Sequence, residues 1–261
     1  MSRYEWDSPV STVVDGDILV RGYPIDELID QVKFSDSIYL VLKGELPSSN
    51  QSDVFRASLS AILDYAMGPA PFSARVVASA NPQLGPAMAA GILAQGKYAV
   101  SPQDAGEFIE LAYGLLLKNN NDMAKTADQI VTEYRAEKKR IPGIGHPSNL
   151  GMDPRAKKLS EVLKRNDLWK QKALLFTTIQ EKWNDVTGKH LVVNVDGMLG
   201  IALSELTFKP VEMGGIAALS MLPGIVANAV HEINYGQPIR QIPNMEYTGV
   251  DKRSINQAMT K

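Results

Sequence analysis

Residues 141–156 read Ile-Pro-Gly-Ile-Gly-His-Pro-Ser-Asn-Leu-Gly-Met-Asp-Pro-Arg-Ala. The first seven contain two prolines and two glycines, which interrupt any helix and predict a loop. Asp153 suits a helix cap and Pro154 suits the first turn of a helix, so helical structure is expected to resume there. This stretch is therefore expected to form a loop between helices in a chain that is otherwise helical.

Helical periodicity extends along almost the whole chain on both sides of this loop. Only residues 191–195, Leu-Val-Val-Asn-Val, have strand character, and small residues in 84–96 would let helices approach closely. A mostly α-helical protein of about ten helices follows. The expected helices begin near residue 153 and otherwise cover 36–43, 52–63, 84–96, 103–118, 122–138, 168–185, 197–207 and 211–234.

The composition describes a folded chain of 261 residues with 44% apolar and 21% charged side chains. The net charge, 27 minus 29, is −2, which provides no broad cationic field for nucleic acid or an anionic membrane surface. The absence of cysteine excludes disulfides, thiolate metal sites and a cysteine nucleophile. Residues 1–17 lack the apolar core of a signal peptide, so a cytoplasmic protein is expected.

The three histidines, His146, His190 and His231, are too far apart for a ligand motif, so no metal site is expected. His146 lies in the glycine-rich loop, where backbone N–H groups could receive an anion and the imidazole could reach a ligand. It could equally be a turn histidine bonded to neighbouring backbone. Asp196 could be a reactive carboxylate or an ordinary helix cap. His190 and His231 are interpreted as structural or surface residues.

Several short motifs, met in the same order along the chain, resemble the citrate synthase superfamily. The Asp196-Gly197 pair and the short chain are similar to the branch that contains citryl-CoA lyase and the C-terminal part of ATP-citrate lyase. The motifs occupy residues 21–28, 37–47, 141–146, 153–156, 194–197, 236–240 and 246–249.

The resemblance implies an all-α, citrate synthase-like fold. A large helical domain would comprise residues 1–89 and 196–261, and a smaller inserted helical domain would comprise 90–195. It also implies a homodimer or higher homo-oligomer with the active site in a cleft. An acyl-CoA thioester and a small carbonyl compound would be the substrates.

The resemblance also implies roles for individual residues. The loop of Ile141, Pro142, Gly143, Ile144 and Gly145 would bind coenzyme A, mainly through its main chain. His146 would hydrogen-bond the carbonyl or hydroxyl oxygen of the acceptor, and Asp196 would move the proton on the α-carbon. Such a division of labour suits an enolate, since one group must handle the carbon-bound proton and another the oxygen.

Three positions depart from the family pattern. Tyr65 stands where family members have a substrate-binding histidine. Leu84 stands where citrate synthases have the histidine that stabilises the enol. Met221 stands where relatives have an arginine that binds a substrate carboxylate. Leaving a carboxylate unpaired in a closed cleft costs several kcal/mol. The substitutions therefore favour a less acidic acceptor. Arg75 and Arg240 could supply the missing grip if they face the cleft, although Arg75 also suits a packing or surface role.

Three functions follow. The departures favour a lyase or synthase with an altered acceptor, such as an apolar or aromatic ketone or aldehyde. Motif order and length favour citryl-CoA lyase, which converts citryl-CoA to acetyl-CoA and oxaloacetate. The third is a non-catalytic CoA-binding homologue, since fold resemblance does not determine activity.

Overall fold

The computed structural model describes residues 7–65, 67–145, 153–241 and 245–255, and His146 lies outside this part of the chain. Within it the fold is mainly helical, as predicted. A three-stranded antiparallel sheet consists of β1 (Ser11–Val14), β2 (Asp17–Val20) and β3 (Tyr23–Pro24). The helices are α1 (Ile25–Gln31), α2 (Phe34–Lys43), α3 (Ser49–Ser60), α4 (Pro69–Ala80), α5 (Leu84–Leu93), α6 (Pro102–Lys118), α7 (Met123–Ala136), α8 (Pro154–Arg165), α9 (Gln171–Thr187), α10 (Val195–Glu205) and α11 (Pro210–Tyr235).

The strand prediction was wrong in two ways: the predicted strand is absent, and a sheet is present where none was predicted. Residues 191–195 contribute a single bridge, between Ile144 and Val193, instead of a strand. The N-terminal sheet was not predicted, although Asp15-Gly16 lies between two β-branched runs and both residues have positive φ (53° and 94°). An Asp-Gly pair between such runs is a strong hairpin signal.

The helix ends follow local capping rules. Asp153 caps α8 by accepting a hydrogen bond from the Arg155 backbone N–H at 2.9 Å, and Pro154 occupies the first turn, as predicted. Gly44 ends α2 in the left-handed conformation with φ of 88°. Ser48 begins α3 with a capping box, slightly before the predicted start.

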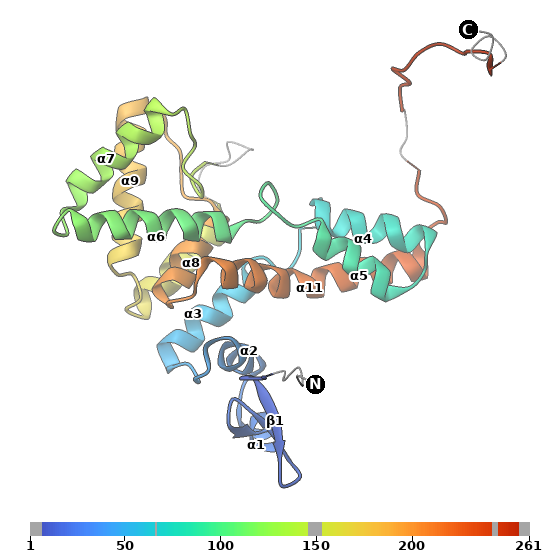
Figure 1. Cartoon of the computed structure of the whole chain (residues 1–261), viewed down its shortest axis with the longest axis horizontal. Coiled ribbons are helices and arrows are strands. Elements are labelled where there is room, and N and C mark those ends of the chain that lie inside the picture. Colours follow the sequence, from blue (N-terminus) through green and yellow to red (C-terminus); the bar gives the residue numbers. More distant parts are fainter. Residues whose placement is uncertain (1–6, 66, 146–152, 242–244, 256–261) are drawn as a thin grey trace, which may run out of the picture.

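Two groups of helices lie on either side of the chain's centre (Figure 1). Helices α6, α7 and α9 contact one another on one side, and α4 and α5 pack with α11 on the other. Helix α10 lies centrally and contacts α3, α6, α8 and α9. The domain boundaries at 89/90 and 195/196 stay predictions.

Helix α11 has 26 residues and is long and apolar enough to cross a membrane. It packs against α4, α5 and α6 and contributes buried side chains to the core. Small residues on α5 let it approach α11 closely, as was expected for residues 84–96. A Cβ atom on Gly91 of α5 would lie 2.6 Å from Cγ2 of Ile225 on α11.

Candidate active site

The predicted CoA loop and the predicted catalytic segment are bonded to each other. The Asn194 backbone N–H donates to the Gly143 carbonyl at 3.0 Å, and the Asn194 side-chain amide donates to the Gly145 carbonyl at 2.8 Å. The Gly145 N–H in turn donates to the Val192 carbonyl at 2.8 Å. Two motifs about fifty residues apart in sequence therefore form one local structure.

Two glycines allow this contact. Gly143 has φ of 82°, and a Cβ atom there would lie 2.5 Å from the Gly197 Cα. A Cβ atom on Gly197 would lie 2.3 Å from the Gly143 carbonyl oxygen. Neither position can hold a larger residue without displacing the other segment. Ile141, by contrast, is buried in the core, so its side chain anchors the loop.

Asp196 lies in the first turn of α10 but is not its cap. Asn194 is the cap, since its side chain accepts a hydrogen bond from the Gly197 N–H at 2.9 Å. One Asp196 carboxylate oxygen, Oδ1, is buried and has no hydrogen-bond partner within the described residues. Oδ1 of Asp196 is thus available to a ligand, and the capping interpretation does not apply.

The surroundings of Asp196 raise the pKa of its carboxyl above that of an ordinary aspartate. Burial raises its pKa, while the Ser101 backbone and the positive charge of Arg155 act in the opposite direction. A carboxyl with a raised pKa binds and releases a proton more readily under physiological conditions than an ordinary aspartate. This property is common at catalytic sites.

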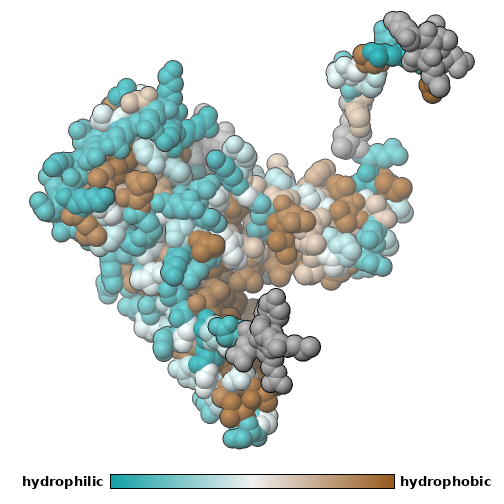
Figure 2. Space-filling model, viewed as in Figure 1, coloured by the Kyte–Doolittle hydropathy of each residue, from teal (hydrophilic) through white to brown (hydrophobic). Residues whose placement is uncertain are grey.

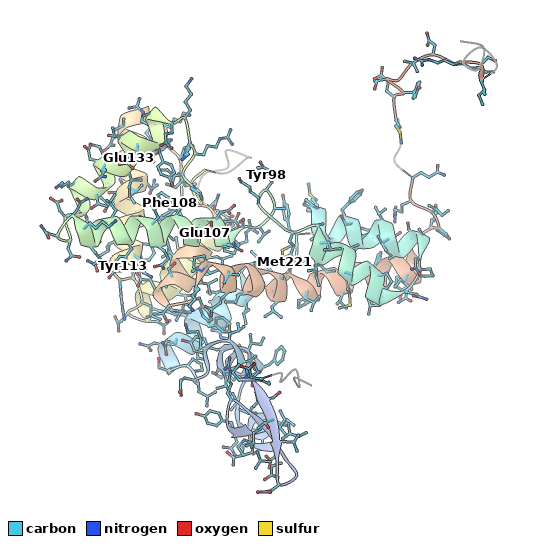
Figure 3. The ribbon with its side chains drawn as sticks, viewed as in Figure 1. Tyr98, Glu107, Phe108, Tyr113, Glu133 and Met221 are labelled. Carbon is cyan, nitrogen blue, oxygen red and sulfur yellow. The ribbon has the colours of Figure 1, made fainter. Side chains whose placement is uncertain are left out.

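Asp196 lines a cavity of about 290 Å³ between the helices. Figure 3 places Tyr98 on the α5–α6 connection and Met221 midway along α11, and both residues line this cavity. The lining residues are Ile62, Asp64, Tyr65, Gly68, Pro69, Ala70, Gln95, Tyr98, Ala99, Val100, Arg155, Asn194, Val195, Asp196 and Met221.

The cavity brings together some of the predicted acceptor-site residues and not others. Tyr65 and Met221 line it with Asp196, whereas Leu84 packs at the edge of the hydrophobic core and is not among the lining residues. Arg75 and Arg240 are not lining residues either. Both form ion pairs with Glu232 of α11, at 2.8 and 2.7 Å. Their positive charges therefore stabilise the buried Glu232 carboxylate and do not face the cavity.

Arg155 lines the cavity but was not among the predicted site residues. Its guanidinium forms two hydrogen bonds with the buried Asp153 carboxylate, at 3.0 and 2.8 Å, and its positive charge acts to lower the pKa of Asp196. Residues 153–156 were interpreted as a helix start and as one of the family motifs, without a role for the Arg155 side chain.

Among the described residues no group of three or more His, Asp and Glu side chains could hold a metal ion. His231 stacks obliquely with Tyr235 on α11, with ring centroids 5.3 Å apart.

The sequence pattern described as "Citrate synthase, C-terminal domain" matches residues 6–66 and 53–241. The chain belongs to the citrate synthase family. The fold is similar to that of citryl-CoA lyase from Hydrogenobacter thermophilus, with a TM-score of 0.89 and 30% identity over 98% of this chain and 99% of that one. These findings confirm the predicted family and fold and support an enzyme of the lyase or synthase type.

Two more distant family members share the fold. ATP citrate lyase from Methanothrix soehngenii, in complex with citrate and coenzyme A, has a TM-score of 0.82 and 18% identity, over 98% of this chain and 43% of that one. Citrate synthase from Thermotoga maritima has a TM-score of 0.58 and 16% identity, over 95% and 94% of the two chains.

Proposed function

We propose that this family member forms or breaks the C–C bond beside an acyl-CoA thioester, using a carbonyl acceptor less acidic than oxaloacetate. The observation that carries the proposal is the Asp196 carboxyl. One of its oxygens is buried and lacks a partner within the described chain, burial raises its pKa, and it lies next to the glycine loop. An ordinary structural carboxylate would be paired.

The chemistry assigns Asp196 one role in each direction. In condensation its carboxylate removes the α-proton and leaves an enolate, which attacks the acceptor carbonyl, and His146 would donate a proton to the acceptor oxygen. In cleavage His146 would accept the proton of the acceptor hydroxyl as the C–C bond breaks, and protonated Asp196 returns a proton to the enolate carbon. The raised pKa of Asp196 suits both roles, because it brings the free energies of the ionised and protonated carboxyl closer together.

The walls of the cavity support the altered acceptor. Ile62, Tyr65 and Met221 supply apolar or aromatic surface, and the Arg155 charge is already paired with Asp153. Oxaloacetate, with its two carboxylates, would bring more negative charge than this lining neutralises.

Citryl-CoA lyase activity is the second candidate. Thirty percent identity over nearly the full length of a citryl-CoA lyase favours it. So does Arg155, since a guanidinium is well suited to bind a carboxylate through two hydrogen bonds. The two candidates differ only in the acceptor, and both require enolate formation.

The test is α-proton exchange of acetyl-CoA and propionyl-CoA in deuterated water, with and without a panel of carbonyl compounds, followed by mass spectrometry. We expect exchange that increases when the correct acceptor analogue is present. Cleavage of citryl-CoA in a parallel assay would select the second candidate. Thermal stabilisation by CoA without exchange or cleavage would contradict both proposals and indicate a non-catalytic CoA-binding homologue.

A homodimer is part of the proposal. Large apolar side chains are exposed on α4, α5 and α11, where Figure 2 shows hydrophobic surface. Phe72 is 59% exposed, Leu93 84% and Tyr235 78%. Contiguous apolar surface of this kind is typical of an interface. Light scattering of wild type and Leu93→Glu should show a dimer that the substitution weakens. A monomeric wild type would contradict it.

A further inference from the structure

Gln95 presents a second unpartnered polar atom to the cavity of Asp196. Its amide nitrogen, Nε2, is buried and has no hydrogen-bond partner within the described residues. Both Gln95 and Asp196 line the same cavity, and both leave an atom unsatisfied there. Buried polar groups in folded proteins are almost always paired, so an unpaired donor and an unpaired acceptor in one cavity indicate a ligand with complementary groups.

The backbone around Gln95 is itself satisfied. The Gln95 N–H donates to the Ile92 carbonyl at 3.1 Å at the end of α5. Gly96 and Ala99 exchange two backbone hydrogen bonds, at 3.2 and 2.8 Å, and close the loop that carries Tyr98 (Figure 3). The loop therefore holds the Gln95 side chain at the cavity without consuming its amide group.

The other side-chain donors around the cavity are occupied or exposed. The amide of Asn194 bonds Gly145, and the guanidinium of Arg155 bonds Asp153. The tyrosine side chains are open to solvent, with Tyr65 54% and Tyr98 97% exposed. Gln95 is thus the buried, uncommitted donor among the described lining residues.

Enolate formation requires such a donor. When Asp196 removes the α-proton, the C–H electron pair forms the new C=C bond and the carbonyl π electrons move onto the thioester oxygen. A donor aimed at that oxygen lowers the barrier. Leu84, at the position where the resemblance implies an enol-stabilising histidine, has no donor and does not line the cavity.

We infer that Gln95 donates a hydrogen bond from Nε2 to the thioester carbonyl oxygen and stabilises the enolate formed by Asp196. The inference rests on the proposed function. No proton leaves Gln95, because an amide acts here only as a hydrogen-bond donor. Gln95 and Asp196 then act on the two ends of the same three-atom unit, the oxygen and the α-carbon.

The test compares Gln95→Met with wild type in the α-proton exchange assay. Methionine keeps the length of the side chain and removes the donor. We expect the exchange rate to fall about 10²–10³-fold, while the Kd for acetyl-CoA changes by less than about threefold. The matched control is Gln83→Met, which removes the same amide from an exposed position. It should leave exchange unchanged.

Gln95→Glu provides a readout that a packing role would not affect. Its carboxyl donates a hydrogen bond only when protonated and repels the enolate when ionised. The ratio of its exchange rate to that of wild type should therefore rise as the pH falls. A ratio that is flat with pH, or a Gln95→Met variant with exchange within about threefold of wild type, overturns the inference. Absence of exchange in wild type overturns the proposed function itself.

Discussion

Two carboxylates on neighbouring helices of this protein, Glu232 and Asp196, have opposite surroundings. Glu232 on α11 is fully buried and accepts hydrogen bonds from Arg240 at 2.7 and 3.0 Å and from Arg75 at 2.8 Å. Asp196 on α10 leaves Oδ1 buried and without a partner in the described chain. Hydrogen bonds from Arg240, followed by those from Arg75, lower the pKa of Glu232 against the opposing effect of burial, whereas burial raises that of Asp196.

The difference indicates a structural role for Glu232 and is compatible with a chemical role for Asp196. Glu232 stays ionised and joins three distant parts of the chain: α4, α11 and the C-terminal segment, where the Arg240 N–H also donates to the Ser79 hydroxyl at 3.0 Å. A carboxylate held so firmly is a poor proton carrier. Asp196 instead leaves a carboxylate oxygen unpaired, an arrangement that costs stability and is common at functional sites.

Asp196→Asn should have the largest effect on activity. Amide replacement keeps the shape but cannot accept the α-proton, so exchange should fall about 10²–10⁴-fold. The same change should hold or raise the Tm at neutral pH, because it removes a charge that burial disfavours. Exchange kinetics and calorimetry together check this. A variant that is both active and less stable would place Asp196 with Glu232 as a structural carboxylate.

Gly197→Ala tests whether the site depends on the contact between the loop and α10. Alanine normally stabilises a helix by up to about 1 kcal/mol relative to glycine. Here its Cβ would lie 2.3 Å from the Gly143 carbonyl oxygen, so we expect a loss of about 1–3 kcal/mol and weaker CoA binding. Gly215→Ala in α11 is the control, since its Cβ would meet nothing within 4 Å and should stabilise. Equal urea midpoints for the two variants would contradict the close approach.

Arg155→Gln should shift the pH dependence of exchange. Exchange requires ionised Asp196 and is lost as the pH falls through its raised pKa. The charge of Arg155 opposes that rise, so its removal should move the midpoint to higher pH. Lys158→Gln changes the charge equally on the exposed face of α8 and is the control. The pH profiles should coincide for wild type and control only.

Glu232→Gln should have the smallest effect on activity and a moderate effect on stability. Removing the charge weakens three hydrogen bonds, so the Tm at neutral pH should fall by a few degrees. Because the folded pKa is lowered, the contribution of Glu232 is present above the unfolded pKa and is lost as the pH falls through the folded one. The Tm difference between wild type and variant should therefore shrink in acid. An exchange rate reduced as strongly as in Asp196→Asn would break the distinction between the two carboxylates.

Local signals predicted much of the fold. Apolar spacing and punctuation by Asp153, Pro154 and Gly44 located most helices, because capping and periodicity depend on residues within one or two turns. The N-terminal sheet was not predicted, because Asp15-Gly16 was not interpreted as a hairpin turn. The close packing of small residues around Gly91 was anticipated correctly.

The site was only partly predictable. Asp196, Tyr65 and Met221 were named and do share a cavity, while Leu84, Arg75 and Arg240 lie elsewhere. An arginine in the sequence has no preferred partner, and Arg75 meets Glu232 across 157 positions. Such a pairing depends on how α4 packs on α11.

The sequence by itself determined the helical fold and the family, because these rest on local periodicity and on motifs in order. Only the tertiary structure decided which groups meet. It brought Gly143 against Gly197, placed Arg155 and Gln95 at the cavity, and turned Arg75 and Arg240 toward Glu232. The physical reason is that hydrogen bonds and desolvation act over a few ångströms in space, whatever the separation along the chain.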